Sequence, residues 1–361
     1  MVRAVIPLSS KTDGTKRKGV KIEMLRLSII IPTYNLESFI GVTLDSCLRQ
    51  NIPSDEYEII CVNDGSTDKS AEVISKYAEK HPNVKLISQT YAGVSTARNK
   101  GIDLAQGRYI WFVDGDDMIS DNCLKDLLYV VESNNLDIFN IEMQSVSTRD
   151  FFNAQMGESI ICPDGEDKLL FMTSKGGTGG GVCISIFKTD LLKNNSLRFS
   201  ENIKYSEDVL FAFKALIKAE RCAKTDSVFY HYYQREGSAM HSSNHIKHIE
   251  SMYLLAGEYL KIADEEEKWR SVSLSKKDFA IKALLFGLVQ NADVKLAKEW
   301  IVKLRSEKLY PFPLLWGSLK NNATLKQVLI NYLSFLFPWR WYFMTCVRLV
   351  ALKNNLRRKN K

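Results

Sequence analysis

The chain lacks the usual marks of secreted or zinc-stabilised proteins. Its seven cysteines are an odd number and include no Cys-x-x-Cys pair, so we expect neither a disulfide framework nor a zinc site. Several lie in apolar runs, which indicates buried thiols in a reducing compartment. The basic stretch of residues 1–24 has neither the apolar core nor the cleavage site of a signal peptide. We expect a cytosolic protein. Its basic N-terminal extension is either disordered, or residues 1–23 are not translated and Met24 is the true start.

Two nucleotide-binding signatures are also missing. No Gly-x-Gly-x-x-Gly follows the first apolar run, where Pro32 stands, which argues against a dinucleotide-dependent oxidoreductase. A sugar nucleotidyltransferase would carry a glycine-rich loop with Arg or Lys at the same place, and this is absent too. The glycine-rich run 176–181 is not followed by the Lys and Ser/Thr of a P-loop. It is either a loop over an acceptor site or an ordinary linker.

Acidic residues are missing from the last stretch of the chain. Residues 340–361 contain seven basic residues and no acidic one, and they set the net charge of +7. The apolar, aromatic-rich segment 329–347 is interrupted by Pro338 and Arg340, and burying that arginine in a bilayer would cost about 2.5–3.5 kcal/mol. The segment is therefore either a helix on an anionic membrane surface or a core helix. Because the basic residues follow an aromatic stretch, nucleic acid is not an expected partner.

Strand and helix patterns alternate from residue 27, within an ordinary globular composition of 45% apolar and 25% charged residues. The predicted strands are 27–31, 58–62, 84–87, 109–113 and 136–141. The predicted helices are 38–50, 68–80, 94–105 and 120–133, the last capped by Ser120, and the chain is helical again from about residue 245. This order predicts an α/β fold with a mostly parallel sheet flanked by helices. Ligands of such sheets bind outside the carboxyl ends of the strands.

The most informative motif is Asp114-Gly115-Asp116-Asp117, directly after the strand of residues 109–113. Carboxylates this close repel one another unless a cation or a proton neutralises them, and their oxygens suit Mg²⁺ or Mn²⁺. The alternative is an acidic turn that caps the following helix.

Taken together, the motifs resemble family 2 glycosyltransferases with the GT-A fold. They are Pro32-Thr33-Tyr34-Asn35, Val62-Asn63-Asp64-Gly65-Ser66-Thr67-Asp68, Gly93-Val94-Ser95-Thr96-Ala97-Arg98-Asn99, the acidic motif, and Ser206-Glu207-Asp208. The resemblance implies a Rossmann-like domain over 25–241, with a donor half (25–142) and an acceptor half (143–241). A helical extension, 242–361, would follow. It also implies metal-dependent, inverting transfer of a sugar from a nucleotide diphosphate, most often UDP.

The resemblance implies roles for particular residues. Asp116 would bind Mn²⁺ or Mg²⁺, Asp64 would accept the uracil N–H, Arg98 would pair with the diphosphate, and Asp114 would reach the ribose. Arg235 and Ser238 would belong to a loop that closes over the diphosphate. The full set of implied nucleotide-sugar-binding residues is Pro32, Tyr34, Asn35, Asp64, Gly93, Arg98, Asp114, Arg235 and Ser238.

Asp208 matches the catalytic base of the family, and Glu207 would orient it or the acceptor. The alternative for this pair is a helix N-terminus stabilised by negative charge. His231 is either a further metal ligand or a core histidine. The family often has Trp and Lys where this chain has Cys183 and Ser185. The acceptor specificity of relatives therefore does not transfer to this chain.

The expected function is sugar transfer to a lipid-linked or polysaccharide acceptor at the inner face of the cell membrane. The alternative is a catalytically silent scaffold of the same fold. The carboxylates of Asp64, Asp114, Asp116 and Asp208 argue against it, because a silent copy has no reason to retain them.

Overall fold

The computed structural model describes residues 25–150, 152–162, 171–172, 181–234, 245–309 and 343–351. Several predictions lie outside these ranges. They concern the N-terminal extension, residues 176–180 of the glycine run, Arg235, Ser238, segment 329–342 and the tail after residue 351. The chain divides into two compact units. The first runs to Glu201 and resumes over Asp208–Ala239, and the second comprises Asn202–Glu207 and the chain from Met240.

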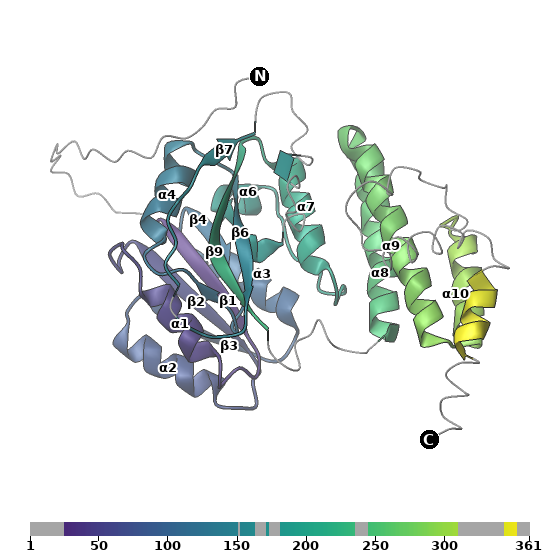
Figure 1. The fold of residues 1–361 in the computed structure, drawn as a ribbon, viewed down its shortest axis with the longest axis horizontal. Coiled ribbons are helices and arrows are strands. Elements are labelled where there is room, and N and C mark those ends of the chain that lie inside the picture. The colour runs from purple at the N-terminus through teal and green to yellow at the C-terminus, as the bar shows by residue number, and fades with distance from the viewer. Residues whose placement is uncertain are drawn as a thin grey trace. The chain divides into compact units, whose positions relative to one another are not determined.

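A single sheet organises the first unit (Figure 1). Its strands are β1 (Leu27–Thr33), β2 (Tyr57–Asp64), β3 (Val84–Gln89), β4 (Tyr109–Phe112), β5 (Met118–Ile119), β6 (Ile138–Val146), β7 (Ser159–Ile161), β8 (Ser185–Lys188) and β9 (Cys222–Tyr233). The spatial order is β3-β2-β1-β4-β8-β6-β9-β5, with β7 paired to β9. Strands β1 to β4 are parallel, as predicted.

The other half of the sheet is mixed, so the expectation of a mostly parallel sheet holds only for the half built by β1 to β4. Strand β8 runs antiparallel to both β4 and β6, and β5 and β7 run antiparallel to β9. Strands β6 and β9 are parallel to each other. Strands β7, β8 and β9 of this half lie in the later part of the chain, where strand and helix patterns no longer alternate regularly in the sequence.

Helices cover both faces of the sheet. They are α1 (Ile40–Leu48), α2 (Ser70–Lys80), α3 (Val94–Leu104), α4 (Leu124–Ser133), α6 (Thr189–Asn194) and α7 (Glu207–Lys218), with the short 3-10 helix η1 (Val182–Ile184). Strand β1 serves both cores because its side chains alternate between the two faces. Ile29 packs in the core with α1 and α4, whereas Ile30 packs in the core with α3 and α7. Burial on both faces explains the unbroken apolar runs of the central strands.

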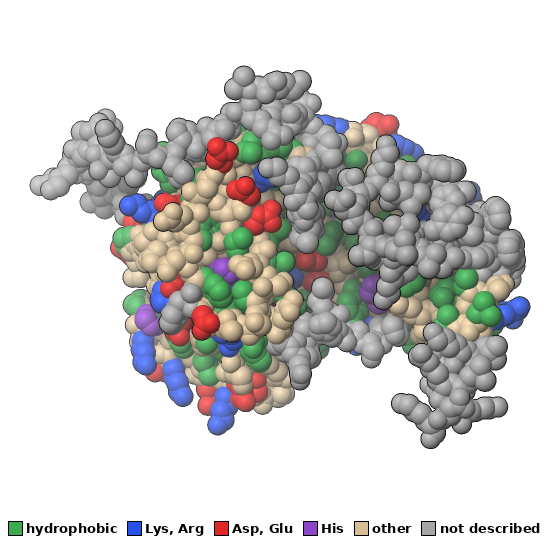
Figure 2. All heavy atoms as spheres, in the orientation of Figure 1, with side chains coloured by type: hydrophobic (Ala, Val, Ile, Leu, Met, Phe, Trp, Pro, Cys, Tyr) green, Lys and Arg blue, Asp and Glu red, His purple; other side chains and the backbone are tan. Residues whose placement is uncertain are grey.

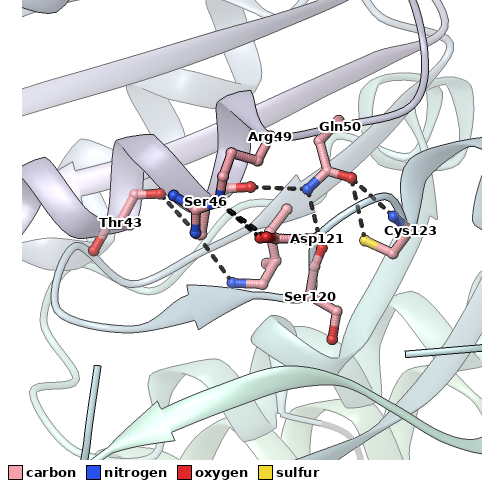
Figure 3. Close-up of polar contacts among 8 residues, drawn as sticks. Thr43, Ser46, Arg49, Gln50, Ser120, Asp121 and Cys123 are labelled. Atoms are coloured by element: carbon pink, nitrogen blue, oxygen red, sulfur yellow. Dashed lines mark hydrogen bonds and ion pairs between the residues drawn. The ribbon is translucent and has the colours of Figure 1, made fainter. Parts of the chain in front are cut away.

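The N-terminus of α4 corrects one prediction. Ser120 does not cap this helix; the side chain of Gln50 does (Figure 3). Its Oε1 accepts from the amides of Cys123, at 3.0 Å, and Leu124, at 3.2 Å, while Nε2 donates to the Ser120 carbonyl at 3.0 Å. Because Gln50 precedes Cys123 by 73 residues, no local pattern in the sequence reveals this cap.

The second unit is helical, as the sequence indicated. It contains α8 (His245–Glu265), the 3-10 helix η3 (Glu267–Trp269), α9 (Arg270–Asn291), α10 (Val294–Ser306) and a helix over 343–351. Phe343, Met344 and Val347 are buried, which agrees with the core alternative for this part of segment 329–347. Within the described ranges, no helix has the length and apolar character needed to cross a membrane.

Candidate active site

The loops that follow β1 and β2 are bonded to each other. Asn35 adopts a left-handed backbone (φ 53°), and its Oδ1 accepts from the Thr67 amide at 2.8 Å. The Asn35 amide donates to Ser66 Oγ at 3.1 Å, and the Leu36 amide donates to Ser70 Oγ at 2.7 Å. Asn35 therefore holds two loops of the carboxyl edge together, which its sequence motif alone did not indicate. A contact between Asn35 and a donor stays a prediction.

Asp64, the last residue of β2, organises the N-terminus of α3. Its Oδ1 accepts from Gln89 Nε2 and the Ala92 amide, each at 2.8 Å, and its Oδ2 accepts from the Gly93 amide at 2.7 Å. Gly93 precedes α3 with φ 105°, a backbone that favours glycine. A carboxylate has about four acceptor positions. Asp64, with 2% of its surface exposed, therefore keeps one for a further donor such as a base N–H.

Tyr34 and Tyr91 form an exposed aromatic pair beside Asp64. Their ring centroids are 4.7 Å apart, and the residues are 44% and 62% exposed. Gly65 permits this arrangement, since a Cβ there would lie 2.7 Å from the Tyr91 amide and its φ of 70° disfavours other residues. Tyr34 was predicted from its motif. Tyr91 was missed because it lies between two motifs and is brought to the edge only by the loop after β3.

Arg98 and Asp114 form an ion pair. Arg98 extends from α3, is almost fully buried and donates through NH2 to Asp114 Oδ1 at 2.8 Å. The guanidinium also lies 5.3 Å from the Phe199 ring centroid, and the Cys183 thiol donates to Asp114 Oδ2 at 3.4 Å. In this structure Arg98 therefore orients an acidic residue, and the predicted contacts of Arg98 with diphosphate and of Asp114 with ribose stay predictions.

Asp117, the third acidic residue of the motif, is a buried structural link. The Tyr230 phenol donates to its Oδ2 at 2.6 Å, and the Tyr233 amide donates to its Oδ1 at 2.9 Å. The same phenol accepts from the Asp114 amide at 3.1 Å. Burial, together with the charges of Asp114 and Asp116, raises the pKa of Asp117 to about 8. Strand β9 thus fixes the acidic loop, a relationship that the sequence spacing could not reveal.

Helix α1 holds the same loop at both ends. Thr43 Oγ1 donates to the Gly115 carbonyl at 3.0 Å, and Ser46 Oγ accepts from the Ile119 amide at 3.2 Å. Both side chains are buried. Gly115 lies so close to α1 and β1 that a Cβ would meet Leu36 Cδ1 at 2.8 Å. The buried polar side chains of α1 therefore help to fix the backbone of the acidic loop.

The residues at this loop fit a divalent cation that is held jointly by protein and ligand. Asp116 is half-buried. Both oxygens of Asp117 accept hydrogen bonds within the protein. Among the described residues, no group of three or more His, Cys, Asp or Glu side chains is arranged to hold a metal alone. Mg²⁺ commonly binds through one or two carboxylates, substrate phosphates and water. Burial is the main cause of the raised pKa of Asp117, and the charges of Asp114 and Asp116 add to it; a cation at this loop would offset the repulsion among these charges.

Arg149 is a second functional candidate that the sequence analysis missed. Its guanidinium lies 5.1 Å from the Phe39 ring centroid and 5.4 Å from that of Tyr233. It donates to the carbonyls of Ser38, at 3.0 Å, and Phe39. Burial lowers its pKa, an effect that the charges of Asp116 and Asp117 oppose. Arg149 is thus a partly buried cation held near the acidic loop.

The predicted base lies at the start of α7. Glu207 is buried, with 8% exposed, and Asp208 is half-buried. A Cβ on Gly181 would lie 3.9 Å from Asp208 Oδ2, which places the end of the glycine-rich run beside this carboxylate. The residue before the pair, Ser206, has a left-handed backbone with φ 63°. The exposure of Asp208 suits a group that meets an acceptor, and the burial of Glu207 suits an orienting role.

His231 is a core residue of the described structure. It is 3% exposed, its ring stacks on Phe152 at 3.9 Å between centroids, and its Nε2 lies 2.8 Å from Ser120 Oγ. Burial lowers its pKa to about 4. The position of His231 agrees with the core alternative of the sequence analysis rather than with a role as metal ligand.

A parallel half-sheet with polar loops at the carboxyl ends of its strands is an architecture in which many α/β proteins bind nucleotides, and comparison with known proteins gives the family. Residues 28–194 match the family model described as glycosyl transferase family 2. The chain therefore contains a family 2 glycosyltransferase domain with the GT-A fold, as the motifs predicted.

Two curated relatives are similar in sequence to this chain over the greater part of its length. The chain is 31% identical over 262 residues to a poly(ribitol-phosphate) beta-N-acetylglucosaminyltransferase, TarS, of Staphylococcus aureus, over 70% of this chain and 44% of TarS. It is 34% identical over 220 residues to a poly(ribitol-phosphate) beta-glucosyltransferase of Bacillus spizizenii, over 60% of this chain and 33% of the relative. The chain thus spans less than half the length of these relatives.

A solved structure supports the same assignment over most of the chain. The crystal structure of Staphylococcus aureus TarS 1-349 in complex with UDP-GlcNAc has a TM-score of 0.60 and 26% sequence identity to this chain. The match covers 92% of both chains.

Proposed function

We propose that this protein transfers a sugar from a UDP-sugar to an acceptor of cell-surface glycan synthesis. The observation that carries the proposal is the convergence of Asp64, Asp114 and Asp116 at the carboxyl edge of the parallel half-sheet, where α/β proteins bind their ligands. The relative solved with UDP-GlcNAc supports a uridine donor. The remaining acceptor position of Asp64 suits the N–H of uracil, and the exposed ring of Tyr34 suits the face of the base.

Mn²⁺ or Mg²⁺ is the proposed cofactor. Asp116 would hold it together with the donor diphosphate, and Asp114, oriented by Arg98, would lie beside the ribose. When bound, the cation neutralises negative charge on the leaving diphosphate. Gly93, Arg235 and Ser238 stay proposed donor contacts on the basis of the resemblance alone.

Asp208 is the proposed general base. Inverting transfer requires the acceptor hydroxyl to lose its proton as its oxygen attacks the anomeric carbon opposite the diphosphate. A half-buried carboxylate at the start of α7 can accept that proton if the hydroxyl lies within hydrogen-bond reach. Glu207, which is buried beside it, would orient the base or the acceptor.

The proposed acceptor is a lipid-linked or polymeric glycan precursor. Two relatives act on poly(ribitol-phosphate), according to their names, and this supports a cell-surface polymer. Described basic and acidic side chains of the first unit are interspersed on the face drawn in Figure 2. The strongest basic stretch is instead residues 340–361 of the sequence, which suits an anionic polymer or membrane surface.

Calorimetric titration with UDP, GDP and a panel of UDP-sugars, each with and without Mn²⁺, tests the donor. We expect metal-dependent binding of UDP and a preference for one UDP-sugar. Asp116→Asn should remove the Mn²⁺-dependent part of the affinity. Metal-dependent binding that persists in this variant would refute the role of Asp116, and no binding by the native protein would favour the scaffold alternative.

The assignment of the base needs a separate variant. Asp208→Asn should retain donor affinity and lose transfer by roughly 10²–10⁴-fold, which is the usual contribution of general base catalysis. Asp190→Asn, a change in the same unit at an exposed position of α6, is the control and should retain transfer. Normal turnover by Asp208→Asn would exclude Asp208 as the base.

Association with the inner face of the membrane is also proposed. It rests on the basic residues 340–361 and the aromatic segment before them. Removal of the chain from residue 329 should abolish co-sedimentation with anionic liposomes. A full chain that does not sediment with them would refute the proposal.

A further inference from the structure

The turn that leads into α7 has an unusual backbone. Ser206 has φ 63°, in the left-handed region that residues other than glycine rarely adopt. The residue before a helix normally has an extended backbone. Such a conformation persists only where the surrounding structure holds it, and it is common at functional sites. Glu207 and Asp208 follow Ser206 directly, so this turn leads into the helix that carries the proposed base.

Helix α8 supplies support for this turn within the second unit. The Lys204 amide donates to Ser251 Oγ at 3.1 Å, and Ser251 is only 2% exposed. The Tyr205 ring lies 5.5 Å from the His248 ring, between centroids. His248 and Ser251 are three residues apart and therefore share one face of α8. This face thus contacts two consecutive residues of the turn.

We propose that Ser251 is a positioning residue for transfer. Its hydroxyl holds the Lys204 amide and thereby keeps Ser206 in its left-handed backbone, in the turn from which Glu207 and Asp208 follow in the chain. The inference rests on the proposed role of Asp208 as the base. Ser251 lies 43 positions after Asp208 in the sequence and touches neither donor nor acceptor in this proposal.

A second buried serine provides a matched control. Ser273 lies on α9 in the same unit and is 0% exposed, but its hydroxyl has no hydrogen-bond partner in the described structure. Ser251→Ala and Ser273→Ala remove the same atom from two buried helical positions. Only the first removes the acceptor of the Lys204 amide.

The first experiment measures single-turnover release of UDP from UDP-GlcNAc in the presence of poly(ribitol phosphate). Ser251→Ala should lower the first-order rate constant roughly five- to tenfold, as expected for one lost hydrogen bond, with UDP affinity unchanged. Ser273→Ala should match the native protein in both. With folded enzyme in saturating excess over the donor, the first-order rate constant does not depend on the folded fraction, so partial unfolding alone would leave it unchanged. An unchanged rate constant in Ser251→Ala would overturn the proposal.

A double variant separates positioning from general packing. Glycine adopts the left-handed region readily, so Ser206→Gly should keep the turn in place with less support. Ser206→Gly combined with Ser251→Ala should therefore be at least about twofold faster than Ser251→Ala alone. A double variant no faster than Ser251→Ala would contradict the proposed route through Ser206.

Hydrogen exchange distinguishes this inference from the proposed function. Amides of residues 204–210 should exchange faster in Ser251→Ala than in Ser273→Ala. Faster exchange with slower transfer supports the proposal, and unchanged exchange overturns it. If the native protein bound UDP but transferred no sugar to any acceptor, the function would fail, while the exchange result would still decide whether α8 holds the turn.

Discussion

The phenol of Tyr230 donates a hydrogen bond to the carboxylate of Asp117 across 2.6 Å. This contact joins β9 to the loop after β4, although the two residues are 113 positions apart. The acidic motif thus contains residues with different tasks. In our proposal Asp116 binds the cation, whereas Asp117 fixes the backbone of the loop that carries Asp116.

Tyr230→Phe tests this division. Loss of the phenol leaves the buried Asp117 carboxyl with one partner fewer, and we expect the free energy of unfolding to fall by about 1–3 kcal/mol. Mn²⁺-dependent UDP affinity should fall as well, because the acidic loop is less well held. Tyr109→Phe is the control, since its buried phenol donates to the Val131 carbonyl at 2.8 Å. It should cost about 1 kcal/mol and retain UDP affinity. Equal UDP affinities in the two variants would contradict the prediction.

The substitution Thr43→Val tests whether a hydrogen bond from α1 keeps the acidic loop in place. The change keeps the shape of the side chain but removes the donor to the Gly115 carbonyl. We expect Mn²⁺-dependent UDP affinity to fall roughly three- to tenfold, as for one lost hydrogen bond. Thr189→Val removes a similar bond, to the Gly107 carbonyl, at a place remote from the motif, and it should retain UDP affinity. Calorimetric titration of both variants with UDP and Mn²⁺ measures these affinities. An unchanged UDP affinity in Thr43→Val would contradict the proposed anchoring of the acidic loop by Thr43.

Asp64 and Glu58 allow a comparison along one strand. Both are buried on β2, and each carboxylate accepts three hydrogen bonds. Asp64→Asn and Glu58→Gln should each lower the free energy of unfolding by about 1–3 kcal/mol, because an amide nitrogen cannot accept these bonds. Only Asp64→Asn should also weaken UDP binding, by at least about tenfold. A similar loss of UDP affinity in Glu58→Gln would show that stability alone accounts for the effect.

His231 predicts an acid-sensitive stability. The pKa of its imidazole is about 4 in the folded state and about 6.5 when unfolded, so the unfolded state binds more protons between these values. The free energy of unfolding should therefore decrease as pH falls from about 6.5 towards 4, by up to about 3 kcal/mol for the full shift. Asp121, whose charge raises the imidazole pKa, opposes the effect of burial.

Denaturant unfolding of the native protein and of His231→Phe, between pH 4.5 and 7.5, isolates this contribution. Other titrating groups are common to both proteins, so the difference between the two pH profiles reports His231. His231→Phe should show the smaller loss of stability in acid. Parallel profiles would mean that His231 titrates near its ordinary value.

The predictable part of the fold is the part with local signals. Strands β1 to β4 and helices α1 to α3 follow from apolar runs separated by amphipathic stretches, and the structure places them close to the predicted ranges. The rest of the sheet depends on pairings between distant segments. Strand β8 enters between β4 and β6, antiparallel to both, and no run of residues indicates that choice.

The candidate site shows the same division. Asp64, Arg98 and Asp114 were predicted from spaced motifs, but their contacts with one another and with the loops were not. Tyr91 and Arg149 were missed altogether, since neither lies in a motif. Only the tertiary contacts identify them as candidates: Tyr91 pairs with Tyr34, and Arg149 lies over the rings of Phe39 and Tyr233.

The sequence by itself determined the family, the parallel half of the sheet and the residue types at the carboxyl edge. These follow from short patterns whose physical basis is local, such as strand burial and the chemistry of clustered carboxylates. Only the tertiary structure decided which internal partners the individual carboxylates take. A buried carboxylate must take its hydrogen bonds from whatever backbone or side chain lies nearest in space. For Asp117 that partner is on β9, and no spacing within the motif could specify it.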